Sequence, residues 1–578
     1  MQTLVVSMAA SSSPDWLNFL LIDYKGDSAF GGCVDLPHVV GKVNDLNPAL
    51  VERSLVSLRA ELDLRKGLFA RAGAKDIDDY QARAQANPEI SPLSRLVIVI
   101  DEFAELAREL PDFVEGLVSV AQLGRSLGVH LILATQRPSG VVSPAIRANT
   151  NIRIALRVMD DVDSSDVVGV VDAARIPSSL PGRALLRLGG GPAVPFQTAR
   201  VTGVGAASDP SLRVTSMEWH TLGRAVPAPE AVEDLRGPSD LATMVEQIAR
   251  ASDGAATPRR PWLDPLPTRL LWSGRGLVEG DGLVLPFGLS DRPHHQRQDL
   301  AALDLAQQGH LFFIGAPRSG RSQALRTIAA SVAELSNVGD VHLYGLDCGT
   351  GALSPITGLP HCGAVVGRHE TARAGRLLAR LVSELEARGA RLGREGVTDI
   401  SEQRRHSSDP MAHVLVMLDG WDGFMATLGQ MPEHLEAVMT LLREGSSVGI
   451  HLLITGDRSL ITNARLSSAV EHRYIFRLAE KSDYGLAGLR SKQVPNALPP
   501  GRCYGPDGVE TQIYLLDADA SGRAQGEVLR HLGEIARRRC QPMSAAQPFR
   551  IDALPSRLVL ADALALAPPR STALPIVG

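Results

Sequence analysis

A chain of 578 residues is too long for one compact core, because single cores stop growing at roughly 250–300 residues. Its 44% hydrophobic and 21% charged residues are typical of globular protein, and a net charge of −5 gives no overall basic field that would indicate nucleic-acid binding. The five cysteines show no metal-like spacing, and no apolar run reaches the length of a membrane-spanning helix.

The first half of the chain predicts short buried strands that alternate with helices. "NFLLIDYKG" indicates a strand that ends at Asp23, and "LVIVIDEF" indicates another that ends at Asp101 and Glu102. A further apolar run, "HLILAT", leads to Gln136. Strands that alternate with helices favour an α/β domain with a parallel sheet, in which ligands bind at the carboxyl ends of the strands.

The second half contains a phosphate-loop pattern in "HLFFIGAPRSGRSQ", at residues 310–323. An apolar strand ends there, and the spacing matches G-x-x-x-x-G-K-[S/T] except that an arginine replaces the lysine. Backbone N–H groups of such a loop wrap phosphate oxygens and the serine hydroxyl holds Mg²⁺, so ATP and Mg²⁺ are the expected cofactors. The candidate nucleotide-binding residues of the loop are Gly315, Ala316, Pro317, Arg318, Ser319, Gly320, Arg321 and Ser322.

The exchange at Arg321 predicts nucleotide binding that is weakened but not lost. Arginine keeps the positive charge, but it is bulkier than lysine and carries a planar fork, so the exchange is not conservative at a tight phosphate site. A glycine-rich turn that binds no ligand is the alternative interpretation of the same pattern.

The two halves of the chain repeat each other. "GRSLGVHLILATQRPS" (124–139) aligns with "GSSVGIHLLITGDRSL" (445–460), and the strands before these segments place Asp101 over Asp419. Near the end of the chain, "PFRIDALPSRLVL" (548–560) echoes "RPWLDPLPTRLLW" (260–272). The predicted division is a first domain at 1–206, a linker at 207–262, a second domain at 263–518, a linker at 519–546 and the start of an incomplete third domain at 547–578.

ATP hydrolysis needs a metal ligand and a base, and the two copies differ in these residues. In the first copy, Asp101 suits Mg²⁺ or its water shell and Glu102 suits polarising the attacking water. An acidic pair at the surface is the alternative interpretation. In the second copy Asp419 persists as a candidate nucleotide and magnesium ligand, but Gly420 replaces the glutamate. The second copy is therefore expected to bind nucleotide without fast turnover.

Several further polar residues are candidates with plain alternatives. Gln136 would sense the γ-phosphate or merely cap its loop. Arg153, with Arg147 and Arg157, would reach the phosphate of a neighbouring subunit or form structural salt bridges, and Arg153 leads because an arginine recurs in the second copy. Trp262 would anchor the linker in a neighbouring pocket or pack into a core.

The first copy is expected to lack its phosphate loop. "QTLVVSMAASSSPDWLNFLLID" aligns without a gap with "RTIAASVAELSNVGDVHLYGLD", which places the equivalent loop just upstream of Met1. The first copy then has acids without a loop and the second has a loop without a base. The chain alone is expected to be a poor ATPase.

The motifs "LIDYKGDSAF", "IVIDEFAEL", "HLILATQRPSG", "IRANTNIRIALRV" and "LPGRALLR" together resemble the FtsK/SpoIIIE family of ring ATPases. The tandem layout with "AGAKDIDDY" and "PWLDPLP" resembles the EccC-type ATPases of type VII secretion, truncated at both ends. The resemblance implies tandem P-loop NTPase domains of the RecA/FtsK-like fold, each a parallel sheet flanked by helices. It also implies an active first domain and a degenerate second domain.

The resemblance implies partners as well. These are other copies of the chain in a ring, expected to be a hexamer, membrane subunits of a secretion complex, and small helical secreted proteins. The chain would then be cytoplasmic, held at the inner face of the membrane through regions or partners outside it. Two alternatives stay open, an FtsK-type translocase that binds DNA and a non-catalytic nucleotide-binding scaffold.

Overall fold

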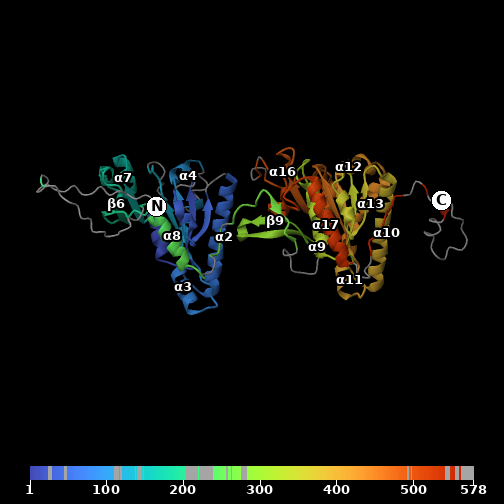
Figure 1. The fold of residues 1–578 in the computed structure, drawn as a ribbon, viewed down its shortest axis with the longest axis horizontal. Coiled ribbons are helices and arrows are strands. Elements are labelled where there is room, and N and C mark those ends of the chain that lie inside the picture. Colours follow the sequence, from blue (N-terminus) through green and yellow to red (C-terminus); the bar gives the residue numbers. More distant parts are fainter. Residues whose placement is uncertain are drawn as a thin grey trace. The chain divides into compact units, whose positions relative to one another are not determined.

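The computed structural model divides the chain into two compact units (Figure 1). The first is formed by Met1–Asp264 with Pro293–Arg297, and the second by Pro265–Arg292 with Gln298–Gly578. Trp262 and Arg147 lie outside the described residues, and the finer division into linkers and a third domain remains a prediction. The structure describes residues 1–560 apart from 24–28, 44–47, 110–115, 118–119, 121, 137, 139–145, 147–148, 204–218, 220–237, 255–257, 262, 275–282, 491–493, 496, 541–546, 554–556 and 558.

The main sheet of the first unit has four parallel strands in the order β2-β1-β3-β4. Strands β1 and β3 are in register over their whole length, so Asp23 lies beside Asp101 at the carboxyl edge of the sheet. Every residue of β1 is buried, as its apolar run predicts. The strand bounds are Leu17–Asp23 for β1, Val39–Val43 for β2, Arg95–Asp101 for β3 and Val129–Leu133 for β4.

Helices cover both faces of this sheet, because side chains along each strand alternate between the two faces. Helices α2, α3 and α4 pack on the face that includes Leu20 and Ile98. Helices α1 and α8 pack on the face that includes Phe19 and Val97. The helix bounds are Gln2–Ala10 for α1, Pro48–Ala72 for α2, Ile77–Ala86 for α3, Phe103–Glu109 for α4 and Asp240–Ala251 for α8.

A separate antiparallel sheet of the first unit has the order β5-β6-β7. One face packs against α7 through a small apolar cluster around Val168. On the strand pair β5-β6, Ile152 and Leu188 lie opposite each other and are 63% and 58% exposed. The bounds are Ile152–Leu156 for β5, Asp161–Val168 for α7, Arg183–Leu188 for β6 and Ala193–Gln197 for β7.

The second unit is built on one mixed sheet in the order β10-β9-β18-β17-β16-β11-β15-β14-β12-β13, with β8 beside β18. The six neighbouring strands β16, β11, β15, β14, β12 and β13 pair in parallel. Strand β17 pairs antiparallel with β16 and β18, and β18 pairs antiparallel with β9. The strand bounds are Leu270–Leu271 for β8, Val284–Arg292 for β9, Arg297–Asp304 for β10, Leu311–Ile314 for β11, Val341–Asp347 for β12, Cys362–Gly367 for β13, His413–Asp419 for β14, Ile450–Gly456 for β15, His472–Phe476 for β16, Arg502–Tyr504 for β17 and Glu510–Leu515 for β18.

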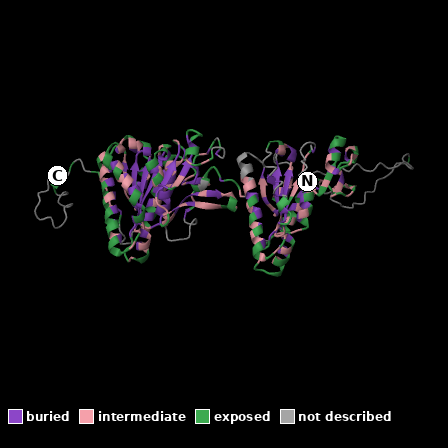
Figure 2. Ribbon diagram, turned by 180° about the vertical axis from the view of Figure 1, so that it is seen from behind, coloured by how far each residue is buried: buried purple, intermediate pink, exposed green. Residues whose placement is uncertain are grey.

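Two apolar clusters fill the spaces between this sheet and its helices. Helices α10 and α13 cover the face that includes Phe312 and Val416, and α9 and α17 cover the face that includes Phe313 and Leu415. Buried residues are concentrated in the strands (Figure 2). The helix bounds are Arg321–Leu335 for α9, Thr371–Glu395 for α10, Ile400–His406 for α11, Trp421–Ala426 for α12, Pro432–Glu444 for α13, Ser459–Thr462 for α14, Ala464–Ala469 for α15, Asp483–Leu486 for α16 and Gly522–Cys540 for α17, with the 3-10 turn η6 at Ser354–Gly358.

The two units share a strand order. In the first it is β4-β3-β1-β2, and the strands aligned with these by the repeat, β15-β14-β12-β13, have the same order in the second. In the second unit β11 lies between β15 and β16. Among the described residues of the first unit, no strand occupies the equivalent place between β4 and β5.

Residues that the sequence assigns to the start of a third domain pack on the second unit. The ring of Phe549 stacks on Tyr344 with centroids 4.2 Å apart, and the Arg380 guanidinium lies 5.1 Å from the Phe549 ring centroid. Arg373 Nε donates to the backbone oxygen of Ile551 at 2.7 Å. Aromatic stacking and a cation over a ring face stabilise this contact.

The architecture confirms the predicted fold class, tandem α/β units with parallel strands flanked by helices. Among the described residues, no helix combines the length and the apolar character needed to cross a membrane. The carboxyl ends of the parallel strands carry the acidic residues that the sequence singles out.

The residue after the acidic strand end is left-handed in both units. Glu102 follows β3 with φ 54°, and Gly420 follows β14 with φ 88°. A residue with a Cβ is disfavoured in this region by about 1–2 kcal/mol, whereas glycine adopts it freely. Gly420 in the second copy therefore adopts this backbone conformation without strain, whereas Glu102 in the first copy adopts it at a steric cost.

We expect Glu102→Gly to be more stable than Glu102→Ala by about 1 kcal/mol, because both remove the carboxylate but only glycine tolerates the left-handed backbone. Denaturant unfolding of the two variants measures this difference. An alanine variant as stable as the glycine variant would contradict a steric cost at this position.

Candidate nucleotide site

The phosphate-loop pattern forms a tight turn between β11 and α9 in which both of its glycines are required. A Cβ at position 315 would lie 2.7 Å from Phe476 Cβ and 2.7 Å from Ser319 Oγ. Gly320 has φ +110°, and a Cβ there would lie 2.8 Å from the backbone nitrogen of Gly501. Larger residues at these positions would push the loop away from the neighbouring chain.

Backbone hydrogen bonds fix the loop over the ends of the neighbouring strands. Gly315 N donates to the Gly456 oxygen at 3.0 Å, and Ala316 N donates to the Arg477 oxygen at 2.7 Å. Pro317 and Arg318 are exposed at the outer turn. Helix α9 then begins at the end of the loop, so its positive amino-terminal end faces the loop, as a phosphate site needs.

Two buried polar atoms of the loop have no hydrogen-bond partner within the described part of the chain. They are Ser319 Oγ and Arg321 Nη1. Buried polar atoms in folded proteins are nearly always satisfied, and an orphaned one calls for a ligand, a water or another explanation. A phosphate group in the loop would supply acceptor oxygens for both atoms, so the residues present fit this ligand.

The structure brings together Ser322 and Asp419, two residues that the sequence analysis proposes as magnesium ligands. Ser322 Oγ lies 2.8 and 2.9 Å from the two carboxylate oxygens of Asp419, and Thr455 Oγ1 donates to Asp419 Oδ1 at 2.6 Å. Burial raises the pKa of Asp419, while the hydrogen bonds from Thr455 and Ser322 oppose that rise. These side chains come from α9, β14 and β15, so the carboxylate joins three elements.

The carboxyl groups of Asp419, Asp422 and Asp457 interact electrostatically with the guanidinium of Arg321. Burial lowers the pKa of Arg321, and these carboxylates counteract part of the shift. The carboxyl groups of Asp422 and Asp457 share a hydrogen bond, and burial together with this neighbour raises the pKa of Asp422. Ser459 Oγ donates to Asp422 Oδ1 at 2.9 Å. The arginine that stands in place of the usual phosphate-loop lysine is thus subject to the field of three acidic side chains.

Sequence reasoning missed Thr455 and Asp457 as members of this site. A signal for Asp457 was present, because the internal repeat aligns it with Gln136. Thr455 lies near the carboxyl end of β15, the strand that pairs directly with β14. Its hydrogen bond to Asp419 therefore depends on which strands are neighbours.

In the first unit, Asp101 ends β3 and Gln136 follows β4, and these two strands pair in parallel. Glu102 is 5% exposed and Gln136 is exposed. The backbone nitrogen of Phe103 donates to the Ala134 oxygen at 2.9 Å, which links the two strand ends. Their assignment to nucleotide hydrolysis remains a prediction.

Arg153 lies on β5, in the small antiparallel sheet rather than in the sheet that carries the acids. Its Nε donates to the Thr150 oxygen at 3.3 Å, and Nε of its repeat counterpart, Arg473, donates to the Val470 oxygen at 2.9 Å. The recurrence of the arginine therefore coincides with a recurring backbone contact. Its predicted role toward a neighbouring subunit remains a prediction.

The donor set at Ser322 and Asp419 suits a hard cation. Mg²⁺ prefers oxygen ligands and is usually held by one or two protein groups together with substrate phosphates. Within the described residues, no group of three or more His, Cys, Asp or Glu side chains forms a metal cage. A hydroxyl and one carboxylate therefore fit a magnesium ion that is shared with phosphate.

The raised pKa of Asp419 predicts a pH dependence of stability. The folded chain retains this proton to higher pH than the unfolded chain, whose pKa is near 3.8, so folding loses stability as pH rises from there through the raised pKa. Relative to that of Asp419→Asn, the free energy of unfolding of the wild-type chain should fall across this pH range and remain constant at higher pH. Chemical unfolding at several pH values measures the difference.

Ser322→Ala gives a second test of the same point. It removes a donor that favours the ionised carboxylate, so the window should extend to higher pH. A stability difference between wild type and Asp419→Asn that is independent of pH would show that burial does not control this group.

A model of the FtsK/SpoIIIE family matches residues 1–140 and 284–494, which together are more than half of the chain. The type VII secretion system protein EssC of Staphylococcus aureus is 31% identical over 512 residues, which is 83% of this chain and 34% of that protein. The ESX-4 secretion system protein EccC4 of Mycobacterium tuberculosis is 30% identical over 538 residues, with coverage of 90% and 43%. The chain thus spans less than half the length of these curated relatives.

A solved structure supports the same relationship. The chain superposes on the cytoplasmic domain of the Thermomonospora curvata type VII secretion ATPase EccC with a TM-score of 0.77 and 28% identity. The match covers 96% of this chain and 63% of that one. The resemblance to EccC-type ATPases is confirmed, and the match to the family model shows that the chain belongs to the FtsK/SpoIIIE family.

Proposed function

We propose that this chain is an ATP-binding motor component of a type VII secretion system, which couples nucleotide binding or hydrolysis to the export of small helical proteins. The relatives named EssC and EccC4, together with the T. curvata ATPase, support the secretion assignment. The observation that carries the nucleotide assignment is the meeting of Ser322 with Asp419 beneath a loop that has two orphaned buried polar atoms.

In the second unit, the loop residues would bind the phosphates through backbone N–H groups and through Arg321. Ser322 and Asp419 would hold Mg²⁺, which neutralises phosphate charge when bound. Gly420 provides no side chain where the first unit has a glutamate. We therefore assign binding, rather than fast hydrolysis, to this site.

In the first unit, Asp101 would bind the metal or its water shell, and Glu102 would accept a proton from the attacking water. Gln136 would lie near the γ-phosphate, and Arg153 would reach a neighbouring subunit. The left-handed backbone at Glu102 supports a functional role, because residues held against steric cost gather at functional sites.

The proposed partners follow from the same family. Further copies of the chain would form a ring, expected to be a hexamer, and the ring would act with membrane subunits on small helical secreted proteins. The chain would work on the cytoplasmic side of the membrane. The net charge of −5 gives no support to a DNA substrate.

Deleting the gene in the organism that encodes the chain should abolish export of small helical proteins and leave chromosome segregation unchanged. Complementation with the wild-type gene or with Ser447→Ala, an exposed serine outside the site, should restore export. Ser322→Ala should fail to restore it, because the metal loses its hydroxyl ligand. Intact export combined with failed chromosome segregation would instead indicate a DNA translocase.

A further inference from the structure

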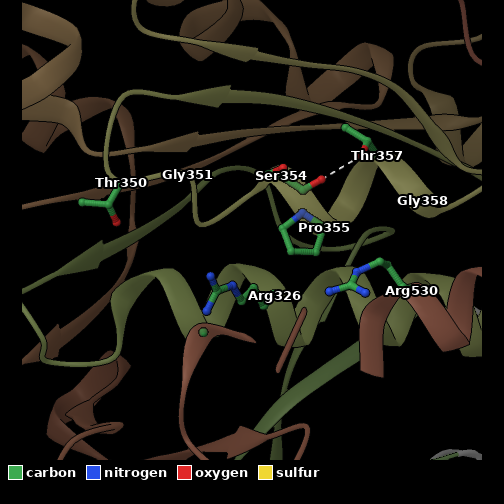
Figure 3. Close-up of a pocket in the computed structure, with 9 residues that line it drawn as sticks. Arg326, Thr350, Gly351, Ser354, Pro355, Thr357, Gly358 and Arg530 are labelled. Atoms are coloured by element: carbon green, nitrogen blue, oxygen red, sulfur yellow. Dashed lines mark hydrogen bonds between the residues drawn. The ribbon is translucent and has the colours of Figure 1, made fainter. Parts of the chain in front are cut away.

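The second unit has a cavity of about 530 Å³ that none of the phosphate-loop residues lines. Its walls come from α9, from the segment that follows β12 together with η6, and from α17 (Figure 3). The lining residues are Arg326, Thr350, Gly351, Ser354, Pro355, Thr357, Gly358, Gly522 and Arg530. Two of the nine are arginines, and none is acidic.

Arg326 lies in the wall of this cavity and is held there through one of its donor groups. It lies one turn beyond Ser322 on α9, and its Nε donates to the Ala352 oxygen at 2.8 Å. Its Nη1 and Nη2 lie 3.7 and 3.5 Å from the place where a Cβ of Gly522 would be. Neither Nη group donates a hydrogen bond within the described residues. One bond thus orients the guanidinium and leaves its outer edge for a ligand.

Arg530 enters the cavity from α17. The flanking glycines on the same helix face pack closely on η6, since a Cβ at Gly526 would lie 2.9 Å from Pro355 Cγ and one at Gly533 would lie 2.5 Å from the Gly358 oxygen. Arg530 itself has no hydrogen bond or ion pair in the part of the chain that the structure describes. Figure 3 shows Arg326 and Arg530 on the same side of Pro355.

Two acidic residues close in sequence to the lining residues accept hydrogen bonds from other groups. Asp347 accepts hydrogen bonds from Gly351 N at 3.1 Å and from Leu353 N at 2.8 Å. Asp519, which precedes α17, accepts from the backbone nitrogen and the hydroxyl of Ser521, both at 2.9 Å. Asp347 and Asp419 do favour the charged form of Arg326, but burial still lowers its pKa. The cavity therefore holds two cations without a carboxylate in its lining.

The lining of the cavity also includes hydroxyl groups, which can donate hydrogen bonds to an oxyanion. Ser354 and Thr350 are exposed at its rim, while Thr357 Oγ1 donates to the Ser354 oxygen at 2.8 Å. The positive end of α17, a helix of 19 residues, faces the same space through Gly522. Guanidinium forks match the geometry of tetrahedral oxyanions, and hydroxyls complete such sites.

We propose that this cavity binds a phosphate group, either as inorganic phosphate or as a small phosphate ester, at a site separate from the nucleotide loop. The ligand would bridge Arg326 and Arg530, and so would link α9 to α17. Because Arg326 shares a helix with Ser322, occupation of the cavity would stiffen the helix that carries the magnesium ligand.

Calorimetric titration with inorganic phosphate and, separately, with glycerol 3-phosphate tests the proposal. Arg530→Ala should weaken binding by about tenfold or more, because a charged hydrogen-bonding group is removed from the ligand. Arg538→Ala is the matched control, since it is an exposed arginine on the same helix that does not line the cavity. Its affinity should stay within about twofold of wild type, as expected for a surface charge.

The same titrations in an Arg321→Ala background separate the cavity from the nucleotide loop. The effect of Arg530→Ala should persist there even if the loop no longer binds. Equal losses from Arg530→Ala and Arg538→Ala, or complete loss of phosphate binding from Arg321→Ala alone, would overturn the proposal. Tighter binding of the ester would identify an esterified ligand, and tighter binding of inorganic phosphate would identify the free anion.

Discussion

The buried carboxylate of Asp419 is the interaction on which the second unit's site depends. It accepts hydrogen bonds from Ser322 on α9 and from Thr455 on β15, so one side chain at the end of β14 holds the start of the loop helix against the sheet. Burying a carboxylate is costly unless donors surround it. Ser322 and Thr455 both stabilise the charged carboxylate, and the Ser322 hydroxyl is also the group that would bind a magnesium ion together with Asp419.

The internal repeat shows which features belong to the fold and which belong to chemistry. Both units keep the strand order, the acidic strand end and the left-handed residue that follows it. They differ in that residue, because Glu102 carries a carboxylate where Gly420 has none. A fold that needs only a left-handed turn is best served by glycine. The glutamate at this position is consistent with the role proposed for it in the first unit.

Much of this arrangement follows from local sequence. Apolar runs predicted the strands, and they correctly placed Asp101 and Asp419 at strand ends. That ligands bind there remains a prediction. Thr455 was missed because its role depends on which strands are neighbours, and strand order is a non-local property. The docking of Phe549 on Tyr344 was missed because an irregular segment has no periodicity to indicate its contacts.

ATP affinity measured with and without Mg²⁺ tests the central claim most directly, because the repeat supplies its own control. The gain in affinity from Mg²⁺ should disappear in Asp419→Asn and persist in Asp101→Asn, since only Asp419 lies beside a phosphate-loop serine in the described structure. Retention of the gain in Asp419→Asn, with its loss in Asp101→Asn, would contradict the assignment of the magnesium nucleotide site to the second unit.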